Sequence, residues 1–233
     1  MRNVRLFCFP YAGGSATVYN SWKPFLQNHV ELIPVELAGR GRRIKEPLLG
    51  NLADTANDII DRISGDLDKG PFALLGHSMG AAIALELSHK IRERKGMTPA
   101  HVFLSGRRPP HIKKDTDKMF HLMSEETFRK EVLELGGTPR EFFEHPELLE
   151  IFLPMLRSDF KNNETYEPAQ GQSPVACDCT VWWGVEDDMT AEEVQQWGQY
   201  FDGDCDVFDF DGGHFFIHDY KEKLGNIISR KLM

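Results

Sequence analysis

Residues 72–85 constrain the fold more than any other stretch, because three local signals follow one another there without a gap. The run 72–75 is short and apolar, which fits a buried strand. From residue 79 to about residue 94, apolar side chains recur at helical spacing: Ile83, Leu87 and Ile91, together with a cluster of alanines. A strand, a tight turn and a helix are therefore predicted in direct succession.

The turn between strand and helix has the pattern Gly-x-Ser-x-Gly, centred on Ser78. A serine at the tip of such a turn is held in a strained backbone conformation, and its neighbours Gly76 and Gly80 leave no room for a β-carbon. The helix begins beneath it, with free N–H groups and the positive end of the helix dipole. Because this arrangement suits a nucleophile and a developing oxyanion, we predict that Ser78 is a nucleophile rather than a plain turn serine.

Length and composition predict one α/β domain over residues 1–233. Hydrophobic residues make up 41% of the chain and charged residues 27%, as in ordinary globular proteins. The formal net charge of −9 argues against nucleic acid as a partner. No run of about 18 apolar residues is present, and no basic-then-apolar leader precedes the first strand, so we expect a cytoplasmic protein without a membrane span.

The first predicted strand, residues 4–9, runs into a glycine-rich loop at residues 10–16. In an α/β hydrolase this loop supplies one N–H of the oxyanion hole, and the residue after the nucleophile supplies the other. We therefore predict the amides of Tyr11 and Met79 as the two donors, with Ala12 as the second choice. The loop lacks Gly-x-Gly-x-x-Gly, which argues against a dinucleotide site.

A basic, glycine-broken stretch follows the next predicted strand, residues 31–36. It places Arg40, Arg42 and Arg43 close together on an acidic protein. Two interpretations remain open: an exposed, solvated loop, or a contact for a phosphate or an acidic partner.

Residues 107–168 interrupt the alternation of strands and helices, since no strand candidate occurs there. Helical patterns are predicted at 124–135 and 147–160, and a capping box at 138–141. We interpret 107–168 as a helical lid embedded in the domain, and refer to it as the lid segment.

The remaining catalytic candidates come after the last two predicted strands, 179–183 and 206–210. Ser attack requires an imidazole, and the imidazole requires a carboxylate that fixes its tautomer. The chain order in this fold is Ser, acid, His. We assign His214 as general base and Asp187 as its orienting acid, with Asp188 as the alternative.

Two other histidines and the cysteines receive structural interpretations. His77 is expected to pack or to line the cleft. His218 lies four residues after His214, but no His-Glu-x-x-His pattern accompanies it, so no metal is expected. The cysteines have neither zinc nor redox spacing and are interpreted as buried or incidental thiols: Cys8, Cys177, Cys179 and Cys205.

Several of these segments together resemble the type II thioesterases that accompany nonribosomal peptide and polyketide synthases. The resemblance extends along nearly the whole chain, and its motifs are residues 8–15, 76–80, 135–139, 153–160 and 210–216. It implies an α/β-hydrolase fold with a mostly parallel central sheet, and a triad of Ser78, His214 and Asp187. The presence of two adjacent aspartates, Asp187 and Asp188, is the one imperfect match.

The resemblance also implies a substrate and a partner. Type II thioesterases hydrolyse acyl groups from the phosphopantetheine arm of acyl or peptidyl carrier domains, which removes stalled or wrong groups from the synthase. No cofactor is implied, because the pantetheine belongs to the carrier. Carrier proteins are acidic, so two basic clusters are candidate docking sites: Arg40, Arg42 and Arg43, or Arg107, Arg108, Lys113 and Lys114.

Two other functions remain possible on the sequence alone. One is a carboxylesterase or acyltransferase with the same triad. The other is a non-catalytic accessory protein that binds carrier domains, against which the presence of nucleophile, base and oxyanion loop argues.

Overall fold

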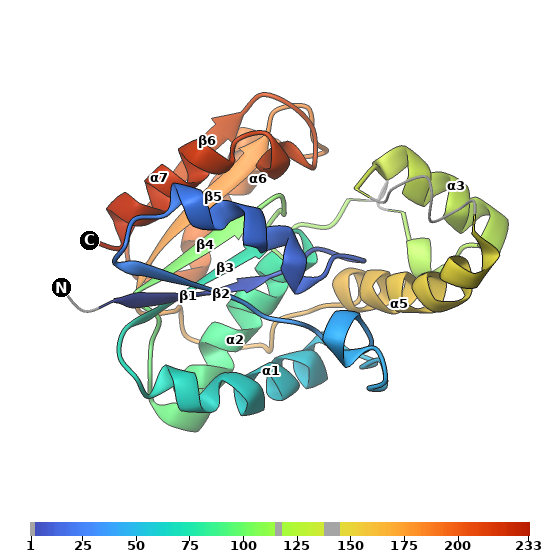
Figure 1. Ribbon diagram of the computed structural model, residues 1–233. Coiled ribbons are helices and arrows are strands. Elements are labelled where there is room, and N and C mark those ends of the chain that lie inside the picture. The colour runs from blue at the N-terminus through green and yellow to red at the C-terminus, as the bar shows by residue number, and fades with distance from the viewer. Residues whose placement is uncertain (1–2, 115–117, 138–144) are drawn as a thin grey trace.

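The computed structural model of the protein describes residues 3–114, 118–137 and 145–233. These residues form one six-stranded sheet in the order β2-β1-β3-β4-β5-β6, in which every neighbouring pair is parallel (Figure 1). The strands are β1 (Val4–Phe9), β2 (Val30–Pro34), β3 (Phe72–His77), β4 (His101–Ser105), β5 (Asp178–Gly184) and β6 (Cys205–Phe210). The predicted α/β fold with a parallel central sheet is confirmed.

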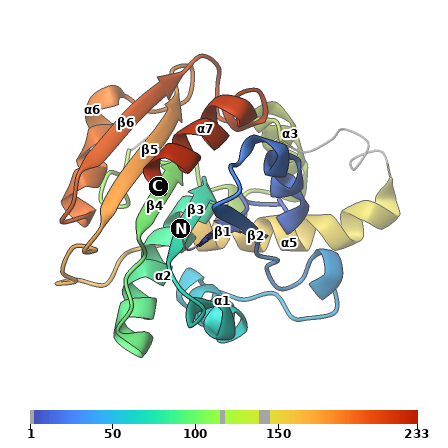
Figure 2. The same ribbon diagram turned by 60° about the vertical axis from the view of Figure 1, so that its left-hand side comes forward.

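Helices cover both faces of this sheet (Figures 1 and 2). One face packs against α1 (Leu52–Leu67), α2 (Met79–Lys95), α6 (Ala191–Gln195) and η4 (Gln196–Tyr200). The other face packs against η1 (Ala16–Phe25) and α7 (Lys221–Lys231). The remaining elements are η2 (Gly41–Arg43), η3 (Phe120–Leu122), α3 (Glu125–Leu135), α5 (Pro146–Glu164) and η5 (Phe216–His218).

Strands β1 and β3 lie in the interior of the sheet and are buried along their whole length, which explains why they read as apolar runs rather than alternating patterns. Their register sets the position of the site. Phe9 lies beside Gly76, and His77 lies beside Ser105, so β1, β3 and β4 end at the same edge of the sheet. Loops that follow these strands therefore meet there, as ligand-binding loops do in open parallel sheets.

Helix boundaries agree with the capping residues in the sequence. Asn51 accepts a hydrogen bond from the Asp54 N–H at the start of α1 (2.8 Å), and Ser124 caps α3. Thr190 and Glu193 form a capping box at the start of α6. A side-chain acceptor at these positions satisfies an N–H that has no partner inside the helix, which is why the signal is local enough to predict.

The segment 17–28 has apolar residues at the spacing of one helix face, which predicts a regular helix, but it does not form an α-helix. The structure has the 3₁₀ helix η1 at Ala16–Phe25, with Pro24 inside it. Pro24 has no N–H to donate to the preceding turn, and the helix ends one residue later, at Phe25.

The described part of the lid segment is helical and contains no strand, in agreement with its pattern. It consists of η3, α3 and α5, which lie beyond the sheet on the side toward which the strands point (Figure 1). The predicted capping box at 138–141 falls outside the described residues. Helix α5 contains Pro154 in its interior. In the described ranges, none of the helices has the length and apolar character that crossing a membrane would require.

The buried His101 should make the free energy of unfolding depend on pH. His101 in β4 is 2% exposed, its Nε2 lies 2.8 Å from Thr180 Oγ1, and burial lowers its pKa from 6.5 to about 4. The unfolded chain therefore binds more protons between these two values, and stability is lost as the pH falls below about 6.5. At about pH 5 the loss from this residue is expected to be about 2 kcal/mol relative to neutral pH.

This pH effect can be measured by urea unfolding near neutrality and at about pH 5, for the native chain and for His101→Gln. Glutamine retains a polar partner for Thr180 but does not titrate, so the variant should lose less stability on acidification. Equal losses in the two proteins would contradict the assignment to His101.

Candidate active site

Ser78 occupies the sharp turn that its sequence context predicts. Its backbone has φ 55° and ψ −116°, and it is the one non-glycine residue at positive φ in the described ranges. A β-carbon at Gly76 would lie 1.9 Å from the carbonyl oxygen of Gly80, and one at Gly80 would lie 2.1 Å from that of Phe9. Both glycines are therefore required by close backbone contacts, and they bring the start of α2 against the end of β1.

This contact places the loop 10–16 next to the first turn of α2. Within the described part of the chain, the N–H groups of Tyr11, Ala12 and Met79 have no hydrogen-bond partner. The carbonyl of Tyr11 accepts from the Gly14 N–H at 2.9 Å, which closes a turn. Free amides at a helix N-terminus and at an adjacent loop are the arrangement that stabilises an oxyanion.

His214 and Asp187 come from the loops after β6 and β5, and their side chains meet. His214 Nδ1 lies 2.7 Å from Asp187 Oδ2, with the two side chains 20% and 14% exposed. Gly184 allows the two loops to approach this closely, because a β-carbon there would lie 2.4 Å from the Gly212 carbonyl oxygen. A half-buried carboxylate on Nδ1 leaves Nε2 as the ring nitrogen available to a reacting group.

Asp188, the alternative acid, points elsewhere. Its carboxylate binds Lys114 at 3.0 Å and Arg108 at 3.1 Å, and its side chain is 72% exposed. The hydrogen bond from Lys114 is the largest cause of the lowered pKa of Asp188. Asp187, not Asp188, is thus the aspartate beside His214.

His77 connects the turn that carries Ser78 to His214. Its ring is buried and lies 5.1 Å from the His214 ring, measured between centroids. Its Nδ1 is 2.9 Å from Ser105 Oγ, and a β-carbon at Gly106 would lie 2.3 Å from the ring. Burial lowers the pKa of His77 well below its ordinary value, so this ring stays neutral and packs against His214. The histidine following β6 and the serine turn therefore lie on the same side of the molecule.

The Tyr11 side chain contacts two residues of the segment that follows β6. Its hydroxyl lies 3.3 Å from His218 Nε2, and its ring packs edge-on against Phe215 with centroids 5.0 Å apart. His218 thus contacts a tyrosine, and burial lowers the pKa of this histidine. Throughout the ranges the structure describes, no group of three His, Cys, Asp or Glu side chains is arranged to hold a metal ion.

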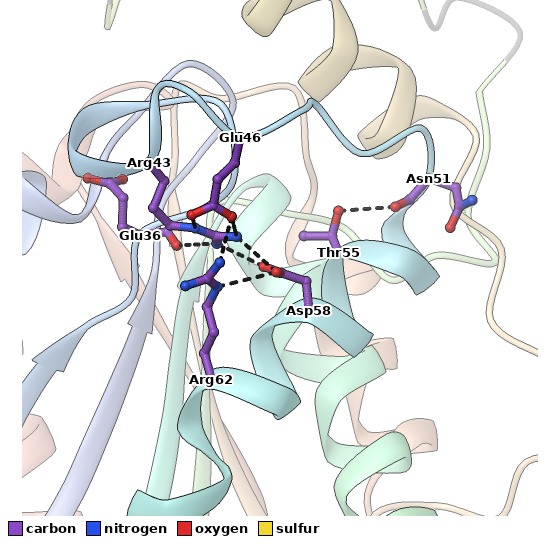
Figure 3. Close-up of polar contacts among 7 residues, drawn as sticks. All are labelled: Glu36, Arg43, Glu46, Asn51, Thr55, Asp58 and Arg62. Carbon is purple, nitrogen blue, oxygen red and sulfur yellow. Dashed lines mark hydrogen bonds and ion pairs between the residues drawn. The ribbon is translucent and has the colours of Figure 1, made fainter.

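The interpretation of the basic stretch after β2 as a solvated or docking patch is wrong for two of its three arginines. Arg40 and Arg43 are each 5% exposed. Arg43 binds the carboxylates of Glu46 (2.6 Å) and Asp58 (2.8 Å), as Figure 3 shows. The sequence of this basic stretch does not show which carboxylates the fold brings against it. In the structure both guanidinium groups are buried and paired with carboxylates.

The second basic cluster is also engaged within the chain. Arg107 binds Asn163, and Lys113 binds Glu167. Arg108 and Lys114 both bind Asp188. Neither cluster is therefore a patch of free cations in the described structure.

Sequence reasoning missed Asp159 in α5. This carboxylate pairs with Arg40 through two contacts of 2.6 Å and accepts a hydrogen bond from the Gly13 N–H at 2.8 Å. Its one sequence signal is its position in the segment 153–160, which matches the family named above.

Comparisons with known proteins identify the family of this chain. The family described as "Thioesterase domain" matches residues 4–232. Among curated proteins, linear gramicidin dehydrogenase LgrE of Brevibacillus parabrevis is 36% identical over 98% of this chain and 88% of its own. The loop after β1 of this chain lacks the Gly-x-Gly-x-x-Gly pattern of dinucleotide sites.

Solved structures give the same result. ClbQ from the colibactin NRPS/PKS pathway superposes with a TM-score of 0.91 at 30% identity, over 99% of this chain and 97% of that one. The type II thioesterase BorB from the borrelidin biosynthetic cluster gives 0.85 at 29% identity, over 99% and 91%. With an α/β-hydrolase fold, a family match over nearly its whole length and these relatives, the chain belongs to the thioesterase family, whose members hydrolyse thioesters.

Proposed function

We propose that this chain is a type II thioesterase that removes acyl groups from the phosphopantetheine arm of carrier domains in a nonribosomal peptide or polyketide synthase. The observation that carries the proposal is the 2.7 Å contact between His214 and Asp187 beside the turn that holds Ser78. Relatives named for NRPS/PKS pathways support the choice of substrate. The proposed partner is an acyl or peptidyl carrier domain, and the proposed role is to clear stalled or wrong acyl groups.

In this proposal Ser78 Oγ attacks the thioester carbon while His214 Nε2 takes the hydroxyl proton. The Nδ1–H of His214 donates to Asp187, which fixes the tautomer and stabilises the imidazolium that forms. The strained backbone at Ser78 presents its side chain above the N-terminus of α2, whose dipole favours negative charge on the reacting oxygen.

The tetrahedral oxyanion is assigned to the amides of Tyr11 and Met79. By analogy with a side-chain donor, each contributes about 2.7–4 kcal/mol to stabilising the transition state. Ala12 remains the alternative loop donor, because its N–H is also free of partners in the described structure.

The second half of the reaction releases the acid. His214 gives its proton to the departing pantetheine thiolate, which leaves an acyl ester on Ser78. Water then attacks this ester with His214 again as general base, and collapse of the second tetrahedral intermediate frees Ser78. Every step uses side chains of this chain, its backbone amides and water.

A substrate comparison tests the proposal. We expect kcat/KM for an acyl-phosphopantetheinyl carrier protein to exceed that for the same acyl group on free pantetheine by at least about tenfold, which corresponds to about 1.4 kcal/mol of carrier contact. A matched oxygen ester of the same acyl group should be hydrolysed more slowly than the thioester.

Each alternative function predicts a different outcome of this comparison. A carboxylesterase would prefer the oxygen ester and gain nothing from the carrier. An acyltransferase would deliver the acyl group to an added alcohol or amine instead of water. A non-catalytic accessory protein would release no acid from any of these substrates.

A further inference from the structure

The loop 10–16 is held in place from outside by charged side chains of two distant segments. Asp159 of α5 accepts a hydrogen bond from the Gly13 N–H at 2.8 Å. Arg40, which follows β2, donates to the Gly14 carbonyl at 3.0 Å. Gly13 is thus fixed through its N–H and Gly14 through its C=O.

The two side chains that hold the loop also bind each other. Arg40 Nη1 and Nη2 lie 2.6 Å from the two carboxylate oxygens of Asp159, and the side chains are 5% and 4% exposed. Such a forked pair fixes orientation as well as distance. Because both groups are buried, neither can turn to solvent without leaving an unpaired charge behind.

Apolar packing brings α5 against the same point of the loop. Gly13 has φ 78°, and a β-carbon there would lie 2.7 Å from Leu156 Cδ1. Ala12 packs against the apolar cluster of the lid segment, which includes Phe152 and Leu156. Helix α5 therefore contacts the loop through both an ion pair and its apolar face.

From these contacts we propose that Asp159 and Arg40 are positioning residues for the oxyanion hole, and that they make its geometry depend on where α5 lies. The proposal rests on the proposed function, in which the Tyr11 amide binds the oxyanion. The turn closed by the Gly14 N–H and the Tyr11 carbonyl connects that amide to Gly13 and Gly14. A displacement of Asp159 is thereby passed two residues along the loop to the donor.

The test uses a small thioester, an acyl-N-acetylcysteamine, so that carrier docking does not enter. For Asp159→Ala we expect kcat to fall about 10-fold to 100-fold with KM nearly unchanged, somewhat less than the loss of a whole oxyanion donor. Asp159→Asn can still accept from the Gly13 N–H and should retain more of kcat than the alanine variant. Binding of an alkylboronic acid, which forms a tetrahedral adduct on serine, should weaken in parallel with kcat.

Asp58→Asn is the matched control. Asp58 makes two 2.8 Å contacts with Arg43, a guanidinium as buried as that of Arg40 (Figure 3), and in the described ranges none of its hydrogen bonds reaches the loop 10–16. Its variant should lose stability while kcat stays within about twofold of the native value, since the transition-state contacts are untouched.

If Asp159→Ala does not fold, Arg40→Lys decides, because it keeps the positive charge but removes the fork that reaches Gly14. We expect it to remain folded and to lose kcat more than KM. The inference is overturned if the folded variants keep the native kcat, or if boronate binding is unchanged. A native chain that hydrolyses no thioester would instead overturn the proposed function and this inference with it.

Discussion

Replacing Ser78 with alanine is expected to lower kcat for thioester hydrolysis by about 10⁶-fold, as loss of the nucleophile does in other serine hydrolases. The substitution removes one oxygen atom and leaves the backbone at φ 55° as strained as before, so the fold should survive. No acyl-enzyme can form without Oγ. Steady-state hydrolysis and mass spectrometry of the protein after exposure to substrate would both report the loss.

Ser88→Ala is the control for this substitution. Ser88 is a buried serine of α2, 1% exposed, and its hydroxyl donates to the Ala84 carbonyl at 2.8 Å. Its variant should hydrolyse substrate at the native rate and show no change in acyl-enzyme mass. Residual activity of Ser78→Ala above about one per cent of native, far more than loss of a nucleophile leaves, would remove Ser78 from the mechanism.

The second large effect is expected for Asp187→Asn, with a fall in kcat of about 10⁴-fold. Asparagine fits the same space, but its amide can donate to His214 Nδ1, which leaves the proton on Nε2. An imidazole in that tautomer cannot take the proton from Ser78. The reaction rate should fall while the melting temperature changes little.

The neighbouring residue supplies the control for the acid. Asp188→Asn breaks exposed ion pairs with Lys114 and Arg108, each worth at most about 1 kcal/mol, and should keep kcat within about twofold. If Asp188→Asn were the variant that lost activity and Asp187→Asn were not, the assignment of the acid would be reversed.

The parts of the fold that were predictable depend on local interactions. The strand, turn and helix at 72–85 follow from residues within a few positions of one another. Order along the chain was also sufficient to bring His214 to the same sheet edge as Ser78, because the ends of parallel strands share an edge.

The parts that were not predictable depend on partners far away in sequence. Arg40 looks like a surface arginine until Asp159, 119 residues later, is placed against it. Asp187 and Asp188 are adjacent and chemically identical. Only the conformation of the turn after β5 determines which of them reaches His214 and which reaches Lys114.

Pro154 has a mechanical consequence for helix α5. Because proline lacks an N–H, the carbonyl one turn earlier has no donor, and bending α5 costs least at this position. The half after Pro154 carries Leu156 and Asp159, which anchor it to the core, whereas the half before it exposes Ile151 to solvent at 57%. Phe152, before Pro154, also lies close to Gly13, so the proline separates two contacts of α5 with the loop 10–16, and a bend there would change their spacing.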